Sequence, residues 1–161
     1  YSSAASDVYK RQLYRSMDRD GDGQVDCKEL FNAIADSDGY LGISCISRFL
    51  RGTGDIRALL DHIDYAVKTV GPDHVAIGTD VAYTSQNAAS EQKKIPRGAR
   101  QRTAFRSLWP RDDFPVTERA RISIAWTNWP LFTVGLVQRG YPDDVIRKII
   151  GGNVLRVTRA S

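Results

Sequence analysis

This chain of 161 residues contains only two histidines, two cysteines and one methionine. Cys27 and Cys45 have neither the spacing of a metal site nor that of a disulfide framework, so we expect free thiols. Free thiols favour a reducing compartment such as the cytoplasm. No apolar run of roughly 18 or more residues occurs, which argues against a membrane segment. Residues 1–12 also lack the apolar core of a secretion signal.

Hydrophobic residues make up 42% of the chain and charged residues 26%, a balance typical of globular proteins. A complete (β/α)₈ barrel takes about 250 residues, so this chain could hold one ordinary domain or part of a larger one. Residues 1–12 (YSSAASDVYKRQ) look like a translated adapter or cloning scar that lies outside the fold. The alternative is the frayed start of a helix that continues into Leu13 and Tyr14.

The sharpest motif is DRDGDGQVDCKE, residues 18–29, which matches the EF-hand calcium loop at its defining positions. Alternate side chains supply oxygen ligands, Gly23 permits the sharp turn, and the closing Glu supplies two oxygens. Residues 13–35 would then form a helix-loop-helix segment. No second loop accompanies it, so we expect weak binding, and a solvated acidic turn is the alternative. The predicted Ca²⁺ ligands are Asp18, Asp20, Asp22, the carbonyl of Gln24, Asp26 and Glu29.

Residues 55–80 predict a helix that feeds a buried strand. Apolar residues recur at helical spacing until Gly71-Pro72, which ends the helix. The run Val75–Thr79 is nearly all apolar, as a parallel strand buried on both faces requires. Asp80 follows directly, and α/β barrels build their active sites at the C-terminal ends of such strands. Asp80 is therefore the candidate catalytic residue.

A second strand is predicted upstream, over residues 39–46 (GYLGISCI). Arg48 lies just beyond it and could bind a substrate carboxylate with two hydrogen bonds. A surface arginine without that role is the alternative, which we favour. The histidines, His62 and His74, lack the spacing of a zinc motif such as H-E-x-x-H, so we expect packing and hydrogen-bonding roles for them.

Residues 81–127 predict a long irregular loop, with basic side chains and two aromatic residues between 93 and 111. A basic stretch with aromatics can bind single-stranded nucleic acid through phosphate pairing and base stacking. A lid over a barrel mouth can have the same composition. We favour the lid, and no nucleic-acid partner, because the loop directly follows Asp80.

Helices are predicted in the C-terminal part of the chain. Asn128 should cap the first of them, whose inward-facing residues would be Leu131, Val134 and Val137. Asn153 should cap a last short helix before the tail at 158–161. The apolar face of the helix between these two would comprise Val145, Ile146, Ile149 and Ile150.

Several of these segments carry a resemblance to a known family. DHIDYAVKTVGPDHVAIGTD, residues 61–80, is similar to the late barrel segment of the membrane (renal) dipeptidase family of zinc peptidases. The similarity resumes at residues 131–157 and extends upstream through 29–35 and 39–43. In all, residues 30–157 resemble the C-terminal part of the family. The resemblance implies an α/β fold that is part of a TIM-type (β/α) barrel.

Dipeptidases of this family use a two-zinc centre, which activates a water and polarises the scissile carbonyl. The resemblance implies that the Zn²⁺ ligands lie upstream of Leu30, so Zn²⁺ belongs to the full-length parent only and dipeptides are the parent's substrates. Asp80 matches the first Asp of the family's strand-end pattern and would position the substrate's amino group or the attacking water. The second Asp of that pattern is absent, since Val81-Ala82-Tyr83 follow.

Two functions thus stay open on the sequence. The chain is the C-terminal part of a zinc dipeptidase, inactive alone, or a calcium-binding EF-hand module on a non-catalytic α/β scaffold. Residues 29–35 belong to both patterns, either because one helix serves both or because unrelated pieces join near 27–29. The oligomeric state and the substrate side chain are not predicted.

Overall fold

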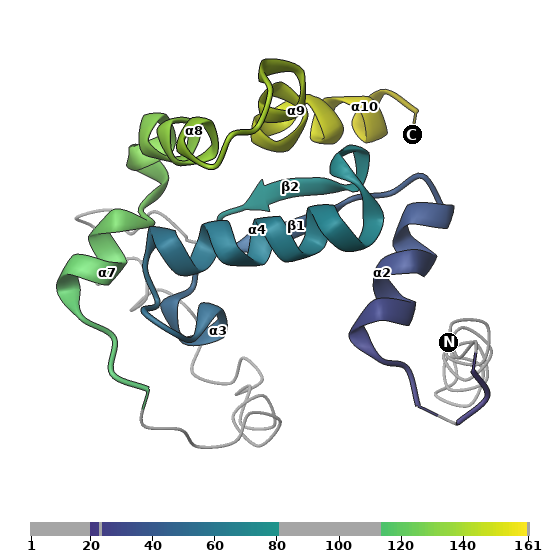
Figure 1. Ribbon diagram of the computed structural model, residues 1–161, viewed down its shortest axis with the longest axis horizontal. Helices are drawn as coiled ribbons and strands as arrows, with labels where there is room; N and C mark the ends of the chain where they lie inside the picture. Colours follow the sequence, from purple (N-terminus) through teal and green to yellow (C-terminus); the bar gives the residue numbers. More distant parts are fainter. Residues whose placement is uncertain (1–19, 23, 81–113, 161) are drawn as a thin grey trace, which may run out of the picture.

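The computed structural model describes residues 20–22, 24–80 and 114–160 (Figure 1). In this part of the chain, helices surround a two-stranded parallel sheet. The elements are, in chain order, α2 (Cys27–Asp36), β1 (Leu41–Ser44), α3 (Ser47–Leu50), α4 (Ile56–Val70), η1 (Pro72–His74), β2 (Val75–Gly78), α7 (Glu118–Ser123), η2 (Trp126–Asn128), α8 (Trp129–Gln138), α9 (Asp143–Arg147), η3 (Lys148–Gly152) and α10 (Asn153–Ala160).

The strands form a β-α-β unit around the longest helix. β1 and β2 run parallel, with Leu41 opposite Val75 and Ser44 opposite Gly78. α4 lies in the connection between them and contacts both strands (Figure 1). A parallel pair needs a long crossover of this kind, because a tight hairpin joins only antiparallel strands. The predicted helix-strand unit is confirmed, whereas a partial TIM-type barrel stays a prediction because the described sheet has two strands.

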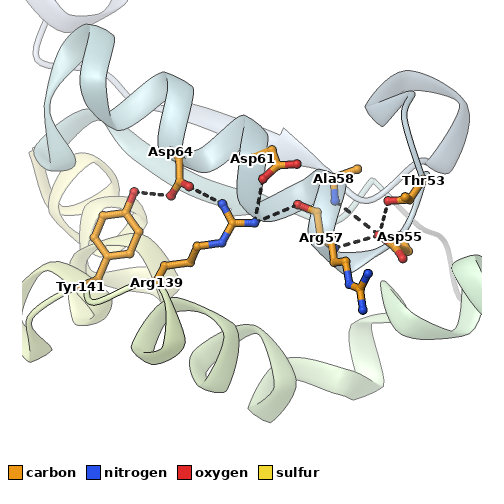
Figure 2. Close-up of polar contacts among 8 residues, drawn as sticks. All are labelled: Thr53, Asp55, Arg57, Ala58, Asp61, Asp64, Arg139 and Tyr141. Carbon is orange, nitrogen blue, oxygen red and sulfur yellow. Dashed lines mark hydrogen bonds and ion pairs between the residues drawn. The ribbon is translucent and has the colours of Figure 1, made fainter.

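α4 begins at a strong capping residue. The Asp55 side chain accepts hydrogen bonds from the backbone N–H groups of Arg57 and Ala58, at 2.9 and 3.4 Å, and from the Thr53 hydroxyl (Figure 2). Partial burial raises the pKa of Asp55, but these hydrogen bonds and the charge of Arg57 outweigh it and lower the pKa below its ordinary value. The helix ends at Gly71, whose φ of 83° is in the region that favours glycine.

We expect Asp55→Ala to lower the free energy of unfolding by about 1 kcal/mol near neutral pH, because α4 loses its N-cap. A carboxyl whose pKa falls on folding contributes stability above its unfolded pKa of about 4 and loses it as the pH falls through the folded value. The difference in unfolding free energy between wild type and Asp55→Ala should therefore become smaller in acid. Urea unfolding followed by circular dichroism, at about pH 7 and about pH 2, measures the gap.

Asp55→Asn is the matched control for this prediction, because Asn caps a helix about as well as Asp and does not titrate. Its advantage over Asp55→Ala should persist in acid. If the gap between wild type and Asp55→Ala is the same at both pH values, the carboxylate is not the origin of the stabilisation.

The core lies between α4, the sheet and the C-terminal helices. α4 contributes Leu59 and Ile63, both fully buried, and β2 is buried along Val75, Ala76 and Ile77. η3 and α10 contact β2, while α8 contacts α4. The C-terminal helices α8, α9 and α10 lie together along one side of the sheet and α4 (Figure 1). The apolar face predicted around α9 is confirmed: Ile146 and Ile149 are buried, and Val145 and Ile150 pack against the same core.

The prediction for the inward face of α8 is wrong. Leu131, Val134 and Val137 are about half exposed, and the buried residues are Phe132, Gly135 and Leu136. The helix is apolar on every side, so its composition does not distinguish one face from another. The contact with α4 decides it, because a Cβ on Gly135 would lie 2.7 Å from the Leu60 Cδ1 atom. Only the glycine face allows this close approach.

The prediction of an irregular segment at residues 81–127 is wrong for its last part, which contains a helix. α7 occupies Glu118–Ser123 and begins at Thr117, whose side chain accepts a hydrogen bond from the Ala120 N–H at 3.1 Å. Ala120 is buried, and Glu118 pairs with Arg121 one turn further on. A threonine cap and one buried contact are enough for a short helix.

Several predictions concern residues that the structure does not describe. They are the scar at 1–12, the helix entering the calcium loop, the ligand Asp18, the lid and the basic stretch at 93–111. Over the described ranges, no helix combines the length and apolar character that a membrane crossing requires.

Candidate site at the carboxyl ends of the strands

The carboxyl ends of β1 and β2 lie side by side because the strands are parallel and in register. One further hydrogen bond joins them past the last pair, from the Cys45 N–H to the Thr79 carbonyl at 3.1 Å. The chain therefore stays fixed up to the peptide that precedes Asp80. The sequence predicts the candidate catalytic residue, Asp80, at this end of the strands.

Asp80 has an exposed side chain and a φ of 49°, in the left-handed region that few residues other than glycine adopt. Asp tolerates this region better than most residues, but the conformation still costs free energy. Backbone strain of this kind concentrates at functional sites, where the surrounding structure holds it. The carboxylate thus lies directly after β2, at the strand end.

Gly42 and Gly78 let the two strands approach closely near their carboxyl ends. A Cβ on Gly78 would lie 3.2 Å from the Cα atom of Gly42, and a Cβ on Gly42 would lie 3.3 Å from the Cα atom of Gly78. Both obstacles are backbone atoms, so a side chain at either position would press the strands apart.

Arg48, the predicted carboxylate-binding residue, lies on α3, the short helix that follows β1. Its side chain is exposed. Arg51, at the end of the same helix, places its guanidinium 5.8 Å from the ring centre of Phe114. Both arginines thus lie beyond the carboxyl end of β1, on the same side of the sheet unit as Asp80.

Each histidine hydrogen-bonds a backbone carbonyl, as expected. His62 Nε2 lies 2.9 Å from the Leu50 carbonyl, and His74 Nδ1 lies 2.8 Å from the Gly39 carbonyl. A carbonyl can only accept, so each ring nitrogen donates. These bonds tie α4 to α3 and the start of β2 to the start of β1.

The described residues do not fit a zinc centre. They contain no group of three or more His, Cys, Asp or Glu side chains that could hold a metal ion. His62-Ile63-Asp64 has H-x-D spacing, but residues two apart on a helix do not face each other. Asp64 instead binds Arg139 and Tyr141, which lie in the turn after α8.

The described part of the calcium loop folds back on its closing residue. Glu29 accepts from the Asp20 N–H at 3.2 Å through Oε1 and from the Asp26 N–H at 3.1 Å through Oε2. Asp26 Oδ1 accepts in return from the Glu29 N–H at 2.7 Å, which completes a capping box at the start of α2. Asp22 Oδ1 accepts from the Gln24 N–H at 2.7 Å.

Among the predicted calcium ligands, the structure therefore brings Glu29 to Asp20 and to Asp26. It does not gather three of the described carboxylates into one metal-binding group. Oxygen-rich side chains are the donors that Ca²⁺ prefers, so the donor chemistry fits the ion. Asp18 and Gly23 lie outside the described residues.

The helix that leaves the calcium loop also belongs to the α/β unit. α2 contacts α4, and Phe31 meets Tyr65 edge to face with ring centres 6.3 Å apart. After α2, the Gly39 carbonyl accepts from His74 immediately before β1 begins. The helix that follows residues 20–26 therefore packs against the α/β unit.

Asn153 was expected only to cap the last helix, but it fastens that helix to the sheet. Its side chain is buried, and Nδ2 donates to the carbonyls of Pro72 and Val75, both at 2.8 Å. These carbonyls flank the start of β2. No local pattern in the sequence reveals this role, because the partners lie about eighty residues away.

Arg156 also connects α10 to the amino ends of the strands. Its guanidinium donates to the Asp38 carbonyl at 2.8 Å and to the Asp73 carbonyl at 2.9 Å, and it pairs with the Asp38 carboxylate. Lys148 pairs with Asp73 at 2.7 Å, which lowers the pKa of Asp73. The amino ends of both strands are therefore secured by the C-terminal helices, opposite the end that carries Asp80.

Comparison with known proteins gives a short similarity in sequence. No family model matches the chain, and no solved structure matches it. The chain is similar to an uncharacterized protein in the pqqA 5' region of Klebsiella pneumoniae, with 39% identity over 54 residues. The match covers 30% of this chain and 20% of that protein, so the chain spans about a fifth of the length of this curated relative.

Proposed function

We propose that residues 30–157 form the C-terminal part of a zinc-dependent dipeptidase. The observation that carries the proposal is the position of Asp80, directly after β2 at the carboxyl end of a parallel strand pair. Active sites of α/β barrels are built at this end. The resemblance of residues 61–80 and 131–157 to the renal dipeptidase family supplies the reaction class.

In this proposal, Asp80 binds the substrate's free amino group or orients the attacking water through its carboxylate. The exposed side chain at the end of β2 suits either role, because the carboxylate is accessible there. Arg48 on α3 is the proposed partner for the dipeptide's carboxylate, since a guanidinium pairs with it through two hydrogen bonds.

In this proposal, residues 30–157 do not hydrolyse dipeptides by themselves. The proposal places the zinc ligands in a part of the protein outside residues 30–157. The described strands would be two of the barrel's strands, and the C-terminal helices would fasten their amino ends. Dipeptides are the proposed substrates. The free thiols Cys27 and Cys45 favour a reducing compartment, the cytoplasm.

A chimera tests the proposal. Residues 30–157 replace the corresponding C-terminal part of a characterised dipeptidase of this family, and zinc content and dipeptide hydrolysis are measured. We expect hydrolysis that depends on zinc. Asp80→Asn should lower kcat/KM by about a hundredfold, the range for losing a positioned acid-base or charge-stabilising group.

Asp73→Asn is the matched control, because it makes the same chemical change near the other end of β2. It should leave kcat/KM near that of the parent chimera. A chimera that folds and retains its zinc but does not cleave dipeptides contradicts the proposal. Equal kcat/KM values for Asp80→Asn and Asp73→Asn would contradict the proposed role of Asp80.

Calcium binding at residues 18–29 is the second candidate function. The observation that favours it is the fold of the loop, in which the closing Glu29 lies against the Asp20 and Asp26 N–H groups. The last glutamate of an EF-hand supplies two oxygens to the ion, so it must lie close to the ligands from the first positions of the loop. Because α2 contacts α4, we propose that calcium stabilises the α/β unit and not the loop alone.

Glu29→Gln separates calcium binding from helix capping. Gln retains the capping box but lacks the charged, bidentate carboxylate. We expect wild type to gain about 2.7 kcal/mol of unfolding free energy at a calcium concentration a hundred times its Kd, and the variant to gain little. Calorimetric titration gives the Kd, and urea unfolding with and without calcium gives the gain.

Amide hydrogen exchange of α4 in the wild type tests the coupling through α2. Calcium should slow exchange in α4 as well as in α2, because the Phe31–Tyr65 contact joins the two helices. Asp36→Asn, at the far end of α2, is the control for a general loss of acidic charge and should still respond. If the wild type shows no heat of calcium binding, or no gain in unfolding free energy with calcium, calcium binding at residues 18–29 is contradicted.

A further inference from the structure

We draw no further inference here: the strongest candidate, the hollow of about 440 Å³ between the N-termini of α4 and α7, carries nothing because the side chains that cap both helices already accept hydrogen bonds from those helices and no buried, unpartnered polar side chain in the described residues points to a ligand there.

Discussion

Asn153→Asp should destabilise the protein by about 3–5 kcal/mol, the range for a buried charge left without a partner. The amide donates to the carbonyls of Pro72 and Val75, both at 2.8 Å, and only 2% of the residue is exposed. An ionised aspartate has the same shape but cannot donate, so two carbonyl oxygens would face a carboxylate in the core. Such a loss is a large share of the stability of an ordinary domain.

Asn128→Asp is the matched control for this experiment. Asn128 also donates its amide to one carbonyl, that of Ile122, but this contact lies at the surface. Water can solvate the new carboxylate there, so we expect a cost of about 1 kcal/mol or less. Urea unfolding near neutral pH measures both variants. Equal costs would show that the buried amide is not what fastens α10 to β2.

Arg139→Met should lower the free energy of unfolding by about 2 kcal/mol, the range for hydrogen bonds to charged groups. The guanidinium donates to Asp61 at 2.7 Å and also to Asp64, and it lies 3.4 Å from the Arg57 carbonyl (Figure 2). Tyr141 donates its hydroxyl to the other oxygen of Asp64 at 2.7 Å. The group thus joins α4 to the end of α8.

The two carboxylates should contribute unequally to this cost. The Asp64 side chain is 25% exposed and the Asp61 side chain is 68% exposed. Solvent screens the exposed pair, and such pairs are worth about 0–1 kcal/mol. In double-mutant cycles with Arg139→Met, we therefore expect coupling above about 1 kcal/mol for Asp64→Asn and below about 0.5 kcal/mol for Asp61→Asn.

The pair of Arg121 with Glu118 on α7 provides the surface reference, since both side chains are about two-thirds exposed. Arg121→Met should cause no measurable change in the free energy of unfolding.

Burial raises the pKa of Tyr141, and its hydrogen bond to Asp64 raises it further. Tyr141→Phe should therefore weaken the Asp64 side of the network only. Equal coupling of Arg139 to both carboxylates would contradict the screening explanation.

Local chemistry was enough to predict the helix-strand unit. The apolar spacing of α4 and the stop at Gly71-Pro72 depend on residues close in sequence, and so does the apolar run of β2. The position of Asp80 follows from the same local pattern, because a residue after a strand lies at that strand's end. The hydrogen-bonding roles of His62 and His74 could also be expected from their spacing, although their partners could not.

The sequence by itself therefore determined which segments form the α/β unit and which carboxylate follows its second strand. Tertiary structure decided the buried face of α8, the packing of α2 against α4, and the partners of Asn153 and Arg139. These depend on contacts between residues far apart in the chain, which periodicity and spacing do not encode. A helix that is apolar on every side can bury any face, and a buried amide selects its acceptors only when distant segments pack around it.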